Sequence, residues 1–147
     1  MKLKKQDFLY VIVQFVLFAV YLADFFVWKI NAPSWLRYIG IALVLIGILF
    51  AAIALLQLNT NLSPFPTPKN GSSLIKNGIF KYIRHPIYGG IILSFFGAGI
   101  YFSSGYKIVV ALLLLTLFYF KSQYEEKRLT ITFPEYTQYK QYTRRFF

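Results

Sequence analysis

The sequence contains no cysteine and only one histidine, His85. The absence of cysteine excludes disulfide bonds, thiolate nucleophiles, iron–sulfur clusters and cysteine-based zinc sites. A single histidine also excludes a multi-histidine metal site within one chain, so we predict no metal centre. Acidic residues are scarce, with 5 Asp and Glu against 16 Lys and Arg. Any catalytic chemistry must therefore come from a small number of oxygen, amine or imidazole groups.

Charged residues of both signs are sparse, whereas apolar residues are abundant and gathered into long blocks. Hydrophobic residues make up 57% of the 147 residues, charged residues make up 14%, and the mean hydropathy is +0.53. A soluble domain of this length needs more charge on its surface. The composition therefore predicts an all-α integral membrane protein that forms a single domain over residues 1–147.

Four apolar blocks predict about four transmembrane helices, because roughly 20 residues at 1.5 Å per residue cross the hydrocarbon core. The first block is too long for the core of a signal peptide and no small-x-small cleavage site follows it, so it predicts an uncleaved span. We expect the fourth helix to continue beyond the membrane to Thr132 and a short interfacial helix to follow it. The predicted spans are 8–28, 35–58, 87–102 and 106–120, with a proline-rich cytoplasmic loop over 59–86 and a cytoplasmic helical tail over 121–147.

Lysine and arginine are unevenly distributed between the two sides of the predicted bundle. Of the 16 such residues, all but Lys29, Arg37 and Lys107 lie in the N-terminus, the middle loop or the tail. The positive-inside rule therefore places both termini in the cytoplasm and the multi-pass protein in the inner (cytoplasmic) membrane. Anionic lipid headgroups account for the net charge of +11 better than nucleic acid, for which the sequence carries no binding signature.

Two polar segments meet at the cytoplasmic mouth of the third and fourth spans. Pro86 suits the first position of a helix, and the free N–H groups of that turn, beside Arg84 and His85, can hold a carboxylate or phosphate. Glu125 and Glu126 lie where the fourth helix leaves the membrane. Carboxylates there can accept hydrogen bonds from ribose hydroxyls or pair with an ammonium or sulfonium. The two segments together suit a zwitterionic cofactor that carries a nucleoside.

One longer pattern contains both polar segments: Gly78-Ile-Phe-x-x-x-Arg84-His-Pro-x-Tyr88, then a helical hairpin, then Glu125-Glu126. This pattern resembles the isoprenylcysteine carboxyl methyltransferase family and the related phospholipid methyltransferases. The resemblance covers roughly residues 59–145. It implies a bacterial, S-adenosylmethionine-dependent membrane methyltransferase that acts on a lipid or lipid-modified small molecule, through a carboxylate or an amine. The cofactor-binding residues that it implies are Ser72, Ser73, Leu74, Ile75, Phe80, His85, Pro86, Ile87, Tyr88, Glu125 and Glu126.

Catalytic roles are expected for three basic residues. Arg84 and His85 belong to the predicted anion pocket. For an amine acceptor the candidate base is His85, Glu126 or a nearby tyrosine. By the resemblance, Lys121 stands where the isoprenylcysteine enzymes carry an arginine that faces the substrate carboxylate. A lysine lacks the two-pronged guanidinium that suits a carboxylate, and Phe80 replaces a usual tyrosine. These departures are compatible with the methyl donor and leave the acceptor, the methylated atom and the oligomeric state open.

Two other functions remain open from the sequence alone. An NADPH-dependent membrane lipid or sterol reductase can carry a similar Arg-His-Pro-x-Tyr element, although asparagine then typically precedes the tyrosine, where this sequence has Ile87. A small non-catalytic membrane protein would bind no nucleoside cofactor. In that case Glu125 would simply pair along its helix with Lys121 or Arg128.

Several further residues have an expected structural role. Gly90, Ser94 and Ala98 predict a face of small residues for helix contact. Gln14 is a polar residue within a span, a position that can mark function, whereas Asp24 is close enough to the interface to be solvated. The aromatic residues of the tail predict an interfacial belt, formed by Tyr136, Tyr139, Tyr142, Phe146 and Phe147.

Overall fold

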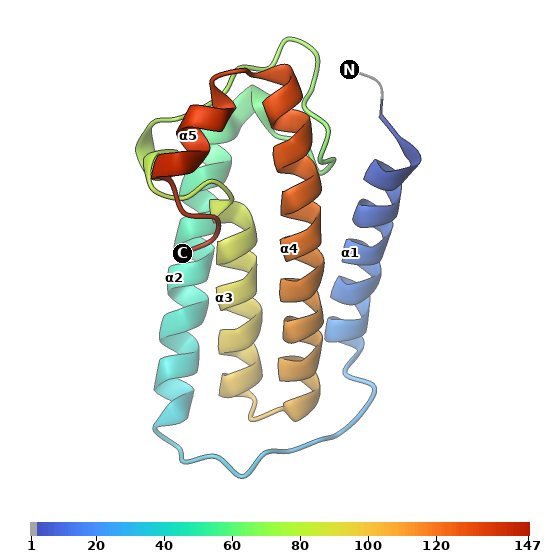
Figure 1. Cartoon of the computed structure of the whole chain (residues 1–147). Coiled ribbons are helices and arrows are strands. Elements are labelled where there is room, and N and C mark those ends of the chain that lie inside the picture. Colours follow the sequence, from blue (N-terminus) through green and yellow to red (C-terminus); the bar gives the residue numbers. More distant parts are fainter. Residues whose placement is uncertain (1–2) are drawn as a thin grey trace.

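A computed structural model describes residues 3–147 as four long, roughly parallel helices with a short fifth helix at one end of the bundle (Figure 1). This architecture confirms the predicted all-α membrane fold. By length and composition α1, α2 and α4 can each cross a membrane, and the 16-residue α3 is a shorter apolar helix. The helices are α1 (Lys5–Ala23), α2 (Leu36–Leu58), α3 (Pro86–Tyr101), α4 (Gly105–Thr132) and α5 (Tyr136–Tyr142), with 3₁₀ turns η1 (Asn59–Asn61) and η2 (Gly78–Lys81) between α2 and α3.

Glycines hold α2 and α3 in direct backbone contact. A Cβ added to Gly47 would lie 2.5 Å from the carbonyl oxygen of Gly90, and a Cβ on Gly90 would lie 2.5 Å from that of Gly47. Gly40 and Gly97 form a second pair, at 2.7 and 2.6 Å. Small residues permit this approach between membrane helices, where van der Waals packing replaces the hydrophobic effect. The predicted small face of α3 is thus confirmed at Gly90, and Gly97 supplies the next close contact.

Replacing Gly90 with leucine should separate these two helices. Because the added side chain meets the α2 backbone rather than a flexible side chain, we expect the free energy of unfolding to fall by about 1–3 kcal/mol. Denaturation in mixed detergent micelles would measure this loss. Ala42→Leu is the matched control, because Ala42 is exposed on α2 and has room for the larger side chain. Equal stability of the two variants would contradict this account of the packing.

The first helix differs from its predicted span of 8–28 at both ends. It begins at Lys5, where the Asp7 carboxylate accepts the Lys4 backbone N–H at 2.6 Å, and it ends at Ala23, before a left-handed Asp24 with φ 47°. The apolar residues that follow are not helical, because Trp28 pairs through its carbonyl oxygen with the N–H of Gly105 at 2.9 Å. The predicted span included this segment because its residues are apolar, but the segment packs against the turn between α3 and α4.

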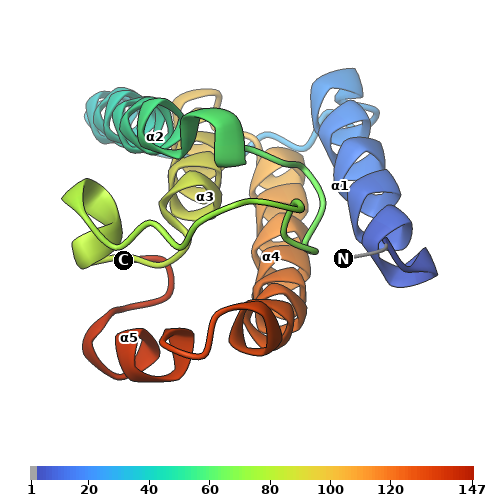
Figure 2. The same ribbon diagram turned by 90° about the horizontal axis from the view of Figure 1, so that it is seen from above.

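The other predicted boundaries agree closely with the structure. Pro86 is the first residue of α3, and α4 runs without a break to Thr132. Seen from above, the segment 59–85 runs from the end of α2 across the bundle and back to the start of α3, close to α5 (Figure 2). We call this end of the bundle, which carries 59–85 and α5, the loop end.

The tail does not form the predicted exposed aromatic belt along its whole length. Tyr136 and Phe146 are buried, whereas Tyr142 and Phe147 remain exposed. The buried Phe146 packs with Ile92, Leu114 and Phe118 in the core between α3 and α4. This burial follows because the chain returns after α5 to the start of α3, where the Arg84 and His85 N–H groups donate to the carbonyl oxygens of Arg144 and Arg145 at 2.8 and 2.9 Å.

Candidate active site

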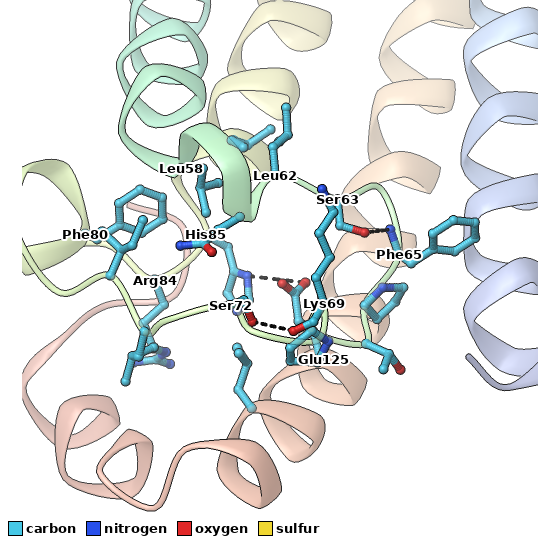
Figure 3. A pocket seen from close by; sticks show the side chains of 18 of the residues that line it. Leu58, Leu62, Ser63, Phe65, Lys69, Ser72, Phe80, Arg84, His85 and Glu125 are labelled. Carbon is cyan, nitrogen blue, oxygen red and sulfur yellow. Dashed lines mark hydrogen bonds and ion pairs between the residues drawn. The ribbon is translucent and has the colours of Figure 1, made fainter. Parts of the chain in front are cut away.

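A cavity of about 320 Å³ lies at the loop end, a volume within the range of small-molecule sites. Its walls come from α1, the end of α2, α3, α4, the segment 59–85 and α5. Figure 3 shows His85 and Glu125 pointing toward each other in this cavity, with Ser72 nearby and with Phe80 and Arg84 to one side. Of the site residues predicted from the sequence, all but Glu126 line it: Ser72, Ser73, Leu74, Ile75, Phe80, Arg84, His85, Pro86, Ile87, Tyr88, Lys121 and Glu125.

Glu125 presents a carboxylate to the cavity from α4. Its Oε2 accepts the Tyr88 hydroxyl at 2.8 Å and lies 3.8 Å from His85 Nδ1, while 24% of the side chain remains exposed. Tyr88 and His85 belong to the start of α3, so this contact joins the two predicted polar segments. A carboxylate that is oriented but still accessible can accept hydroxyl donors or attract a cation.

The structure gives Glu126 a different position from the one predicted. Its side chain is only 2% exposed and does not line the cavity. It accepts hydrogen bonds from Arg84 Nε at 3.1 Å and from Arg145 Nε at 3.1 Å, and it lies 3.0 Å from Lys140 Nζ and 3.3 Å from His85 Nε2. These partners occupy the carboxylate, so it holds the C-terminal tail to α3 and α4.

The Arg84 side chain lines the cavity and also contacts the tail. Besides Glu126, its guanidinium donates to the carbonyl oxygens of Lys140 and Thr143, and its side chain is 8% exposed. The anion-binding role predicted for Arg84 would have to use the part of the group that lines the cavity. The backbone N–H groups of Ile87 and Tyr88, in the first turn of α3, remain as donors because Pro86 has none and α3 starts there.

Two residues that line the cavity, His85 and Tyr88, belong to an aromatic stack. The Tyr88 ring lies parallel to His85, with centroids 5.4 Å apart, and parallel to Phe118 at 4.6 Å. Lys121 Nζ lies 5.3 Å from the centre of the Tyr88 ring and donates to Gln14 Oε1 at 2.6 Å. Gln14 therefore belongs to the cavity wall. The sequence signalled it only as a polar residue within an apolar span.

The segment 59–85 is fastened over the cavity by residues that sequence reasoning did not connect with the site. The buried Asp7 of α1 accepts the Thr67 backbone N–H at 3.0 Å and the Thr67 hydroxyl at 2.7 Å. Arg128 of α4 donates to the same Thr67 hydroxyl at 3.2 Å. This contact holds Pro64–Pro68 between α1 and α4. In the sequence, Asp7 is a single acid among N-terminal lysines, a pattern that does not predict this role.

The tail also supplies two cavity residues that the sequence placed in a membrane-interface belt. Tyr136 and Tyr139 line the cavity, and the Tyr139 hydroxyl donates to the carbonyl oxygen of Phe80. Burial raises the pKa of Tyr139 to about 12, against the opposing effect of Arg84. The Tyr139 hydroxyl therefore stays protonated at neutral pH and remains a donor, which fixes η2 and the Phe80 ring against α5.

The sequence was also compared with known proteins. The family model described as phospholipid methyltransferase matches residues 35–135, more than two thirds of the chain. No curated protein matches the chain. The matched range contains α2, α3 and α4 with every predicted site residue, whereas α1 and α5 lie outside it.

Proposed function

The chain belongs to the phospholipid methyltransferase family, a family of membrane methyltransferases, and on that premise we propose that it transfers a methyl group from S-adenosylmethionine to a lipid or lipid-modified acceptor. We place the reaction at the cytoplasmic face, because the loop end carries most of the lysine and arginine of the sequence. The observation that carries the proposal is the pairing, in one cavity, of the accessible Glu125 carboxylate with the first turn of α3.

The residues of the cavity fit the charged groups of the methyl donor. Glu125 suits the ammonium or the ribose hydroxyls, and the N–H groups of Ile87 and Tyr88 suit the carboxylate. Phe80 and the segment Ser72–Ile75 offer an apolar wall with hydroxyl groups for the adenosine. A cofactor with opposite charges at neighbouring positions thus meets a complementary group at each of them.

When bound, S-adenosylmethionine supplies a methyl group on a sulfonium, which a nucleophile can take in a single in-line transfer. The contribution of the protein to such a reaction is to position the reactants and to exclude water. The Tyr88 ring, stacked with His85 and Phe118, donates its hydroxyl to Glu125 and lies 5.3 Å from Lys121 Nζ, so it can position both groups. Pro64–Pro68, held by Asp7, covers the cavity from the aqueous side.

The requirement for a base depends on the acceptor. A carboxylate is already ionised and needs none, whereas an ammonium acceptor must first lose a proton. His85 is the candidate base for that proton, because its Nδ1 faces Glu125 in the cavity while its Nε2 lies beside Glu126. The hydrogen bonding of the neighbouring glutamates would stabilise the imidazolium that results.

Calorimetric titration of the purified full chain with S-adenosylhomocysteine and, separately, with NADPH tests the proposal. We expect S-adenosylhomocysteine to bind at one site per chain and NADPH not to bind, because the accessible Glu125 carboxylate in the cavity would repel the several phosphates of the dinucleotide. Binding of NADPH alone would favour a reductase. Binding of neither nucleotide to protein with a cooperative melting transition would favour a non-catalytic role.

A further inference from the structure

The segment that joins α1 to α2, at the end of the bundle opposite the loop end, presents apolar side chains outward (Figure 1). Five of them lie close together at the end of α1 and just beyond it, and each is 57–89% exposed: Leu22, Phe25, Phe26, Val27 and Trp28. We call these five residues the outer apolar surface. Contiguous exposed apolar residues mark a surface that contacts something other than water.

The polar groups at the end of α1 turn the other way, towards the protein. The carbonyl oxygens in the last turn of a helix have no partners within that helix. Here the Val20 carbonyl oxygen accepts the Tyr106 hydroxyl at 2.7 Å, and that of Tyr21 accepts the Lys107 ammonium at 3.0 Å. Side chains of α4 therefore take the place that water has at the exposed end of a helix in a soluble protein.

Charge in this region is also compensated within the protein. Asp24 is the one charged residue between Leu22 and Trp28, and its carboxylate lies 3.6 Å from Lys107 Nζ. The ammonium of this buried lysine also lies 4.6 Å from the centre of the Tyr21 ring. A paired charge can remain at the boundary of a lipid bilayer, whereas an unpaired one would draw the segment into water.

Two opposing requirements define the depth of this segment. Its backbone has left the helix, and unpaired peptide groups are not tolerated in the centre of the hydrocarbon. Its exposed side chains are apolar, so full exposure to water is unfavourable. Backbone hydrogen bonds hold it beside the turn between α3 and α4, because the Gly105 N–H donates to the Trp28 carbonyl oxygen at 2.9 Å and the Ile30 N–H donates to that of Ser103 at 2.8 Å. The boundary between headgroups and acyl chains satisfies both requirements.

The outer apolar surface continues the lipid-facing side of α1. Phe8, Phe15 and Leu22 are spaced by about two helical turns, so they lie on one face of the helix, and all three are exposed. Since α1 is long and apolar enough to cross a membrane, lipid covers this face. The outer apolar surface begins at Leu22 and therefore extends a contact that α1 already makes with acyl chains.

We infer that the outer apolar surface binds the bilayer leaflet opposite the loop end, with its side chains among the upper parts of the acyl chains and Asp24 towards the headgroups. This inference goes beyond the proposed methyl transfer and does not depend on it. It also defines the depth of the loop end. The 16 residues of α3 span about 24 Å, less than the roughly 30 Å of the hydrocarbon core. With the α3–α4 turn held at one boundary, Pro86 and the cavity wall that begins there lie no farther out than the headgroups of the other leaflet.

Fluorescence quenching tests the inference with a native residue, because Trp28 and Trp35 are the two tryptophans of the sequence. Trp35→Phe leaves Trp28, whose ring packs on Gly105 and is more than half exposed, as the single probe. The full chain is reconstituted into phosphatidylcholine vesicles whose acyl chains carry bromine either near the glycerol or near the terminal methyl group. We expect bromine near the glycerol to quench Trp28 about twofold more strongly than bromine near the methyl group, because interfacial aromatic residues lie just below the headgroups. Iodide on both sides of the bilayer should quench Trp28 no more than about half as strongly as N-acetyltryptophanamide in the same suspension.

A tryptophan in the middle of α2 is the matched reference. Leu45 is exposed there, so Leu45→Trp, combined with Trp28→Phe and Trp35→Phe, places the probe at the centre of a span. This protein should show the reverse order, with the stronger quenching by bromine near the methyl group.

Three results would overturn the inference. If iodide quenched Trp28 as strongly as the free amide and neither brominated lipid quenched it, the segment would lie in water. If neither iodide nor brominated lipid quenched it, a second copy of the chain or another protein would cover the surface. If Trp28 showed the same profile as the Leu45→Trp protein, the segment would lie in the centre of the hydrocarbon. The proposed function stands in each case, because the nucleoside titration tests it separately.

Discussion

Glu125→Gln should lower the affinity for S-adenosylhomocysteine by at least 30-fold and leave the fold intact. The substitution preserves the shape of the side chain but removes the charge that faces the cavity. Loss of one partner from a desolvated, hydrogen-bonded charge pair costs about 2–5 kcal/mol, and each 1.4 kcal/mol corresponds to about tenfold in affinity. The fold should tolerate the change because Glu125 keeps 24% of its side chain exposed and the Tyr88 hydroxyl can donate to an amide oxygen instead.

Calorimetric titration and a thermal melt of the same preparation would measure these two effects. Glu135→Gln is the matched control, because Glu135 is an exposed acid at the start of α5 and does not line the cavity. It should bind the nucleoside as the wild type does. If Glu125→Gln bound the nucleoside with unchanged affinity, the carboxylate would have no part in holding the cofactor, and the proposed pairing of Glu125 with the start of α3 would be wrong.

The fold was largely predictable from local patterns. Apolar blocks give the spans because a lipid environment demands helices, and Pro86 marks the start of α3 because proline fits the first turn alone. The end of α1 was not predictable in this way. Phe25–Trp28 are as apolar as the helix before them, and they leave the helix because Trp28 packs against Gly105, a residue far away in the sequence.

The site was predictable where its residues lie close together in the sequence. Ser72–Ile75, Arg84–Tyr88 and Glu125, which the sequence assigned to the candidate site, all line the cavity. The contributions of Gln14 and Tyr136 could not be predicted, because they depend on how α1 and the tail fold back onto α4. The two adjacent glutamates also looked alike. Neighbouring residues on a helix point about 100° apart, so only three-dimensional packing decides which one faces the cavity.

Glu126→Gln should therefore mainly lower the stability of the fold, whereas the same change at Glu125 should lower the affinity for the nucleoside. The carboxylate is 2% exposed and is the common partner of Arg84, Arg145 and Lys140. Removing its charge leaves the nearly buried Arg84 guanidinium unpaired, and breaking a buried ion pair on one side costs about 3–5 kcal/mol. We expect a loss of this size in the free energy of unfolding, measured by denaturation in mixed detergent micelles.

Lys140→Met separates this effect from a general loss of surface charge. Lys140 contacts the same carboxylate, but 48% of its side chain is exposed, so its removal should cost less than about 1 kcal/mol. Limited proteolysis should cut after Arg144, a site that both variants keep, sooner in Glu126→Gln than in Lys140→Met, because Glu126 fastens the tail to α3 through Arg84 and Arg145. If both variants were as stable as the wild type, the tail would be held by its other contacts, which include the backbone hydrogen bonds with Arg84 and His85 and the buried Phe146. Glu126 would then be free for another role.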